Sequence, residues 1–186
     1  MKKLLWVLIL LLLPLTAWAE DAEIHRDGAF FYQIADGEAT LTGCDWDAMQ
    51  ADSLYMFAEP PVSLEIPATL GGYPVTSIGG GVFCSLDGCP VDAPFEVVLP
   101  EGLRTLDAYT FTECFYATKI TLPASLTGIS AHMFENCEGL VTVTVPEGLL
   151  EIGDSAFAGC KKLENCPLPP NLTRVGSYAF DKCTLW

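Results

Sequence analysis

An interval of 23 residues recurs through the second half of this chain. Proline, phenylalanine and cysteine each return at that step, and apolar residues between them keep the same spacing. The recurring residues are Pro100, Pro123, Pro146 and Pro169; Phe111, Phe134, Phe157 and Phe180; and Cys114, Cys137, Cys160 and Cys183. A fixed period of this length indicates one structural unit that stacks on copies of itself, because a single unit cannot bury its own apolar face.

Each unit contains a short alternating stretch that predicts a strand. In residues 120–123 (ITLP) and 143–146 (VTVP), apolar and polar residues alternate before the proline. This alternation turns every second side chain inward, as in a half-buried strand, and the proline ends it. We expect strands of successive coils to pair in parallel, about 4.8 Å apart. The return segment turns back and packs its phenylalanine and cysteine into the interior.

The repeat resembles a known family. Residues 156–180 (AFAGCKKLENCPLPPNLTRVGSYAF) are similar to the BspA-like, or treponemal-type, leucine-rich repeat. Residues 66–83 resemble the usual lead-in of that family, and residues 30–44 are similar to the hairpin that often caps such arrays. The resemblance implies a leucine-rich-repeat solenoid of the α/β-type repeat class with an N-terminal β-hairpin cap. We expect about four to five coils, mostly short parallel strands with irregular or short helical return segments.

The chain divides into three parts. Lys2 and Lys3, an apolar run and then Ala17-Trp18-Ala19 predict a signal peptide over residues 1–19. Residues 20–77 form the predicted cap, with the hairpin, an insertion at 45–61 and a lead-in strand, and residues 78–186 form the repeats. No later segment approaches the roughly 18 apolar residues of a membrane span. We therefore expect a secreted, periplasmic or cell-surface protein with no transmembrane segment after signal removal.

Two segments and the C-terminus depart from the regular repeat. The insertion at 45–61 is interpreted as a short helix over the N-terminal end of the core, with an exposed apolar loop for a partner as the alternative. The chain stops where the next strand would begin, which we interpret as a finished terminus rather than a truncated array. The first coil, residues 78–106, is five residues longer than the others.

The cysteines suggest architecture more than chemistry. The four recurring ones should point inward side by side, which suits buried free thiols better than disulfides. Cys84 and Cys89, in the longer first coil, are the candidate disulfide. His132 precedes Cys137 by five residues, but the residues one period from it are tyrosine and serine, so a catalytic Cys-His pair is disfavoured. We expect no enzyme activity.

Charge and composition exclude further classes. Loss of Lys2 and Lys3 with the signal leaves seven basic against 24 acidic residues, a formal charge of −17. Scattered basic residues make nucleic acid a poor partner. The two acidic groups, Asp45, Asp47 and Asp52, and Asp87 and Asp92, lack the ligand spacing of a calcium loop. We expect no metal and no cofactor.

A protein-binding surface remains. The outward strand positions form two columns, and leucine-rich arrays commonly bind through such a face. The candidate binding residues are Glu96, Val98, Lys119, Thr121, Thr142, Thr144 and Asn165. The resemblance implies a non-enzymatic module for adhesion or host interaction, with host extracellular matrix or another cell-surface protein as partner, often in host-associated bacteria. The alternative is an accessory envelope protein that self-associates or packs on a partner through residues 45–61 or the array ends.

Overall fold

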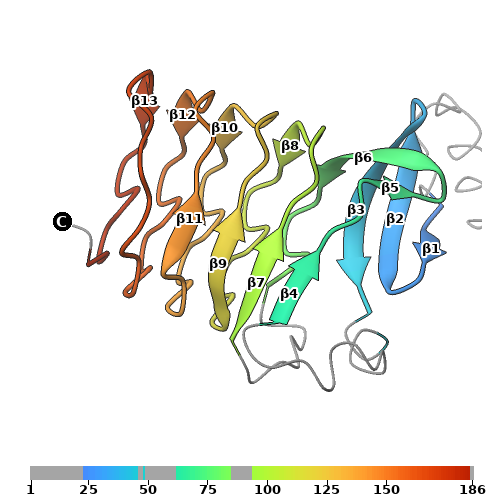
Figure 1. The fold of residues 1–186 in the computed structure, drawn as a ribbon, viewed down its shortest axis with the longest axis horizontal. Helices are drawn as coiled ribbons and strands as arrows, with labels where there is room; N and C mark the ends of the chain where they lie inside the picture. The colour runs from blue at the N-terminus through green and yellow to red at the C-terminus, as the bar shows by residue number, and fades with distance from the viewer. Residues whose placement is uncertain (1–22, 46–47, 49–61, 85–93, 185–186) are drawn as a thin grey trace, which may run out of the picture.

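The computed structural model describes residues 23–45, 48, 62–84 and 94–184. These residues form an elongated stack of coils, with a small antiparallel sheet at the N-terminal end (Figure 1). Each further coil along the stack follows the next stretch of the chain, so the order of coils in space is the order in sequence. The stacking predicted from the 23-residue period is therefore present.

An antiparallel hairpin begins the fold. β2 (Phe30–Ala35) pairs with β3 (Glu38–Cys44), and β1 (His25–Asp27) pairs with β2. Asp36 and Gly37 connect β2 to β3 with φ of 52° and 78°, the positive values that a two-residue hairpin turn requires. β3 then pairs in parallel with β6 (Tyr73–Ile78), which also pairs with β5 (Thr69–Leu70). The hairpin is thus joined by hydrogen bonds to the array.

The first ladder consists of β4 (Val62–Glu65), β7 (Phe95–Val98), β9 (Ala117–Thr121) and β11 (Thr142–Thr144). All three pairings are parallel, and Val97, Ile120 and Val143 meet in register on the buried side. These are the strands that the alternating pattern predicts. Beyond β11, the described part of the chain continues the ladder only through a bridge between Thr142 and Asn165, because the following prolines lack the N–H group that pairing needs.

The second ladder was not predicted. It contains β8 (Thr105–Leu106), β10 (Gly128–Ile129), β12 (Glu151–Ile152) and β13 (Arg174–Val175), on the other side of each coil (Figure 1). Strands β10, β12 and β13 form one parallel sheet, whereas β8 pairs with β6. Each complete coil therefore has two short strands rather than one.

Tight turns form the return segments, and all the named elements of the described residues are strands. The turns place a left-handed residue at the same step in each coil, at Tyr109, His132, Ser155 and Tyr178. Backbone N–H groups in these turns donate to the next coil, as from Phe134 to the Ala156 carbonyl at 2.8 Å. These hydrogen bonds between coils pair backbone groups that a helical return segment would pair within itself.

A column of phenylalanine rings fills the interior. Phe83, Phe111, Phe134 and Phe157 are fully buried, and their rings stack at centroid distances of 4.8, 5.5 and 5.0 Å. Phe180 continues the column 5.1 Å beyond Phe157 but is only partly buried. The spacing of the rings follows the spacing of the coils, which explains why the sequence repeats phenylalanine at a fixed interval.

Candidate functional site

The first ladder brings the predicted binding residues together on one face. Glu96 lies beside Lys119, and Lys119 lies beside Thr142, in the register of the parallel strands. The second column contains Val98, Thr121 and Thr144 in the same order. Asn165 joins the first column through its bridge to Thr142. We call these seven residues, with Ser63 and Glu65, the strand face.

Ser63 and Glu65 are additions that the sequence did not reveal. β4 pairs with β7 so that Ser63 lies beside Glu96 and Glu65 beside Val98. The interval between these partners is 33 residues, ten more than the period, because five extra residues lie between β4 and the end of β6 and five more lie in the first coil. A search at a step of 23 therefore misses them.

Most side chains of the strand face are uncharged. Lys119 Nζ lies 3.2 Å from Glu96 Oε2, so these two charges offset one another. Four of the remaining seven side chains carry a hydroxyl group, and Glu65 adds a second carboxylate. Hydrogen bonds along the ladder fix the spacing of the backbone beneath them. Such a surface offers hydrogen-bond donors and acceptors at fixed spacing, with no group arranged to activate a nucleophile.

Among the recurring cysteines, Cys114, Cys137 and Cys160 are buried inside the coils and Cys183 is partly buried. The Cys137 thiol donates to the Phe111 carbonyl at 2.9 Å, and the Cys160 thiol donates to the Phe134 carbonyl at 3.0 Å. The hydrogen bond with the Cys137 thiol raises the pKa of Cys160, and burial adds to the increase against a lowering by Cys183. A raised pKa keeps the thiol protonated and unreactive. Cys166, one period after the buried Val143, is also buried, with 8% of its surface exposed.

His132 and Cys137 have separate partners. His132 Nδ1 lies 3.0 Å from Glu135 Oε2, and its ring stacks on Tyr109. Cys137 is fully buried against Phe111 in the preceding coil. The histidine therefore lies at the surface turn and the thiol in the interior, which is the arrangement that the repeat predicts.

Several sequence predictions fall on residues that the structure does not describe. Cys89 lies outside the described residues, so its pairing with Cys84 stays a prediction. Asp47, Asp52, Asp87 and Asp92 also lie outside them, as does nearly all of the insertion at 45–61. Within the described ranges no group of three or more His, Cys, Asp or Glu residues could hold a metal ion.

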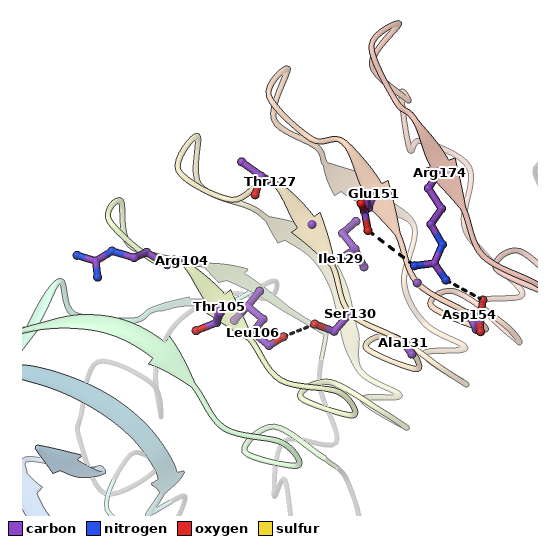
Figure 2. A pocket seen from close by; sticks show the side chains of 12 residues that line it. Arg104, Thr105, Leu106, Thr127, Ile129, Ser130, Ala131, Glu151, Asp154 and Arg174 are labelled. Atoms are coloured by element: carbon purple, nitrogen blue, oxygen red, sulfur yellow. Dashed lines mark hydrogen bonds and ion pairs between the residues drawn. The ribbon is translucent and has the colours of Figure 1, made fainter. Parts of the chain in front are cut away.

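A hollow of about 440 Å³ opens along the second ladder. Figure 2 shows Arg104 at one end and Arg174 at the other, with Arg174 directed toward Glu151 and Asp154. Gly128 stands between Thr105 and Glu151 in the same column, and a Cβ there would meet nothing within 4 Å. The missing side chain leaves space in the surface.

The hollow lies where the second ladder is interrupted. β8 pairs with β6 on one side, and β10 pairs with β12 on the other. At the step between β8 and β10, the Ser130 hydroxyl donates to the Leu106 carbonyl (Figure 2). The next step, between the coils of β10 and β12, has a backbone hydrogen bond instead: the Leu150 N–H donates to the Thr127 carbonyl at 2.8 Å.

Comparison with known families decides the identity of the array. Residues 76–186 match the model described as the BspA type leucine rich repeat region, in six copies. The chain belongs to the BspA-type leucine-rich-repeat family. The BspA-type match contains both ladders from β8 onward and the whole phenylalanine column from Phe83.

Solved structures share this BspA-type fold. A leucine-rich repeat protein of T. pallidum superposes with a TM-score of 0.69 at 23% identity, covering 88% of this chain and 69% of that one. A leucine-rich repeat protein from Bacteroides ovatus gives 0.65 at 25% identity, covering 84% of this chain and 38% of that one. The pneumococcal vaccine antigen PcpA gives 0.60 at 19% identity, covering 88% and 48%.

The BspA-type chain spans less than half the length of the last two proteins. No curated protein matches it in sequence. In the part of the chain that the structure describes, no helix has the length and apolar character needed to cross a membrane.

Proposed function

We propose that this protein is a secreted or cell-surface, non-enzymatic binding module that attaches to other proteins through the strand face. Leucine-rich repeat proteins generally bind proteins, and the family is shown by the match over residues 76–186. The observation that carries the proposal is the alignment of Glu96, Lys119 and Thr142, and of Val98, Thr121 and Thr144, across three hydrogen-bonded strands. A rigid, regular, partly exposed sheet can present all of these groups to one partner with little ordering cost.

Adhesion to a host or to another cell is the finer proposal. The BspA-like resemblance implies it, and the signal peptide predicted over residues 1–19 would deliver the chain to the required side of the membrane. The partner would be a protein of the host extracellular matrix or of another cell surface. The pneumococcal protein of similar fold is described as a vaccine antigen, which supports this direction.

The test measures binding of residues 20–186 to purified matrix and serum proteins immobilised one at a time. A triple variant that combines Lys119→Ala, Thr142→Asp and Thr144→Asp should bind any such partner at least about tenfold more weakly, because the three residues lie at the centre of the strand face. Lys162→Glu is the control, since Lys162 is exposed, also changes the charge and lies outside both ladders and the hollow. Equal loss in the control, or no loss in the strand-face variants, would contradict the proposal.

A second candidate function is supported by the C-terminal end of the described array. Val175 is 50% exposed, whereas Ile152, one coil earlier, is fully buried. An apolar residue left open at the end of a stack offers a surface to a second copy or to an envelope component. Light scattering during size exclusion distinguishes the two functions: a dimer that Val175→Asp converts to monomer would favour self-association, and a monomer at all concentrations would exclude it.

A further inference from the structure

One column of turn residues has no part in the strand face. Tyr109, His132, Ser155 and Tyr178 follow one another at the 23-residue step, and all four have left-handed backbones, with φ of 65°, 57°, 52° and 57°. The shared backbone conformation and parallel stacking direct their Cα–Cβ bonds the same way. The repeat therefore keeps a left-handed backbone at this position, where three of the four side chains carry a ring and the fourth is serine.

The two adjacent rings already interact. Tyr109 and His132 stack with centroids 4.9 Å apart and planes inclined by 9°. Tyr109 is 48% exposed, whereas Tyr178, which has serine rather than a ring one coil before it, is 76% exposed. Ser155 thus marks a vacant place in a row of rings.

The size of this vacancy follows from the coil spacing. Two steps of 4.9 Å separate the His132 and Tyr178 positions by about 10 Å, as expected for alternate strands of a parallel stack. A planar group midway would lie about 5 Å from each ring, within the range of centroid distances for stacking and cation–π contacts. We call the space over Ser155, between His132 and Tyr178, the ring slot.

Carboxylates border the ring slot. Glu135 contacts His132 Nδ1 at 3.0 Å, and Asp154 directly precedes Ser155. Asp154 accepts the Ser177 N–H at 2.8 Å and lies 4.0 Å from an Arg174 nitrogen, yet its side chain is 54% exposed. The formal charge of the chain is −15. A cation is therefore favoured over a neutral or anionic planar group such as a nucleotide base.

We propose that the ring slot binds an arginine side chain of a partner protein. The guanidinium group is planar and cationic, so it can stack between two rings while it donates to a carboxylate such as Asp154, which an ammonium group cannot do. Ala131 and Asp154 line the hollow in Figure 2, and each directly precedes a residue of the slot, His132 and Ser155. The partner segment carrying the arginine has room to lie along this hollow.

The experiment is a titration of residues 20–186 with three acetylated and amidated pentapeptides, Gly-Ser-X-Ser-Gly, in low-salt buffer. X is arginine, lysine or citrulline, which separate planarity from charge. Ring signals of His132 and Tyr178 are followed by nuclear magnetic resonance. The arginine peptide should shift both rings and bind about threefold more tightly than the other two, in line with an exposed cation–π contact.

Ser155→Tyr is the decisive variant, since tyrosine occupies the same left-handed position at Tyr109 and Tyr178. It should fill the slot, preserve the melting temperature and abolish the arginine-specific shift. Tyr178→Ala, at an exposed position, should also abolish the threefold preference. Thr142→Ala on the strand face should leave it unchanged, so a failure of this proposal is distinguishable from a failure of the proposed function.

Three results would overturn the assignment. Equal binding of the arginine and lysine peptides would mean that net charge alone attracts them. Stronger binding of the citrulline peptide would indicate a neutral occupant. Unchanged binding to the Ser155→Tyr variant, folded as judged by its melting temperature, would place any contact elsewhere.

Discussion

Corresponding residues of the repeat are buried to different extents in the interior coils and in the last described coil. Ile152 is fully buried and Val175, its partner in the next coil, is 50% exposed. Phe157 is fully buried and Phe180 is partly buried. Since the local sequences are alike, the difference comes from the neighbour on the C-terminal side. In a stacked array each coil is closed by the next one, so stability is a property of neighbouring pairs.

The phenylalanine column gives the largest expected effect. Phe134→Ala removes a ring that stacks on Phe111 at 5.5 Å and on Phe157 at 5.0 Å, and should cost about 3–5 kcal/mol of unfolding free energy. Phe180→Ala should cost about half as much, because part of that ring is already in water. Urea unfolding followed by circular dichroism measures both. Equal losses would mean that the last coil is closed as tightly as the interior.

The second ladder provides a smaller version of the same comparison. Ile152→Ala should destabilise by about 2–4 kcal/mol, as for other fully buried aliphatic residues. Val175→Ala should cost less than about 1 kcal/mol, since half of the side chain is exposed. The two variants are compared by their midpoints of urea unfolding, with the dependence of unfolding free energy on urea concentration held the same for both. A larger loss at Val175 would show that something covers this position in solution.

The cysteine column sharpens the comparison further. Cys137→Ala should leave a small cavity and lower stability by about 1–2 kcal/mol, with the hydrogen bond to the Phe111 carbonyl also lost. Cys183→Ala should have a weaker effect, because Cys183 is only partly buried although its thiol also donates to a carbonyl, that of Phe157. Thermal unfolding of the two variants under reducing conditions is the measurement.

Alkaline pH tests whether the last coil is open on both sides. On its first-ladder side Cys166 is buried, and desolvation raises the pKa of its thiol from 9.0 to about 12. The folded state therefore keeps a proton that the unfolded chain releases near its ordinary pKa. This contribution is complete below about pH 9 and is lost as the pH rises toward 12.

Melting temperatures between pH 8 and 11 should accordingly fall more for the wild-type protein than for Cys166→Ala. Parallel curves would show that the Cys166 thiol is solvated, and that the first-ladder side of the last coil is as open as the second-ladder side around Val175.

The parts of the fold that recur every 23 residues could be predicted from the sequence. Regular spacing of Phe134 and Cys137 located the interior column, and the alternation around Ile120 and Val143 located the first ladder. The second ladder was missed because strands of two residues, such as Gly128–Ile129, are too short to show alternation. Ser63 was missed because extra residues before the end of β6 and in the first coil lengthen its interval to Glu96 beyond the period.

Other features depend on conformation rather than residue type. His132 looked like a departure from the repeat, yet it shares a left-handed turn with Tyr109, Ser155 and Tyr178. No rule of residue identity connects these four: the 23-residue step places them in one column, and only the backbone shows the left-handed conformation that they share. The hollow at Gly128 has the same origin, since a glycine in one column becomes a cavity only once its neighbours are stacked beside it.

Alkylation of the folded protein tests the central claim, that the recurring cysteines build the interior of a closed stack. Residues 20–186 are treated with iodoacetamide at pH 8, quenched at intervals, and analysed by mass spectrometry at each cysteine. Cys137 and Cys160, fully buried, should remain unmodified until the chain unfolds, and Cys183 should react first among the recurring ones. Rapid modification of Cys137 in the folded protein would contradict the account.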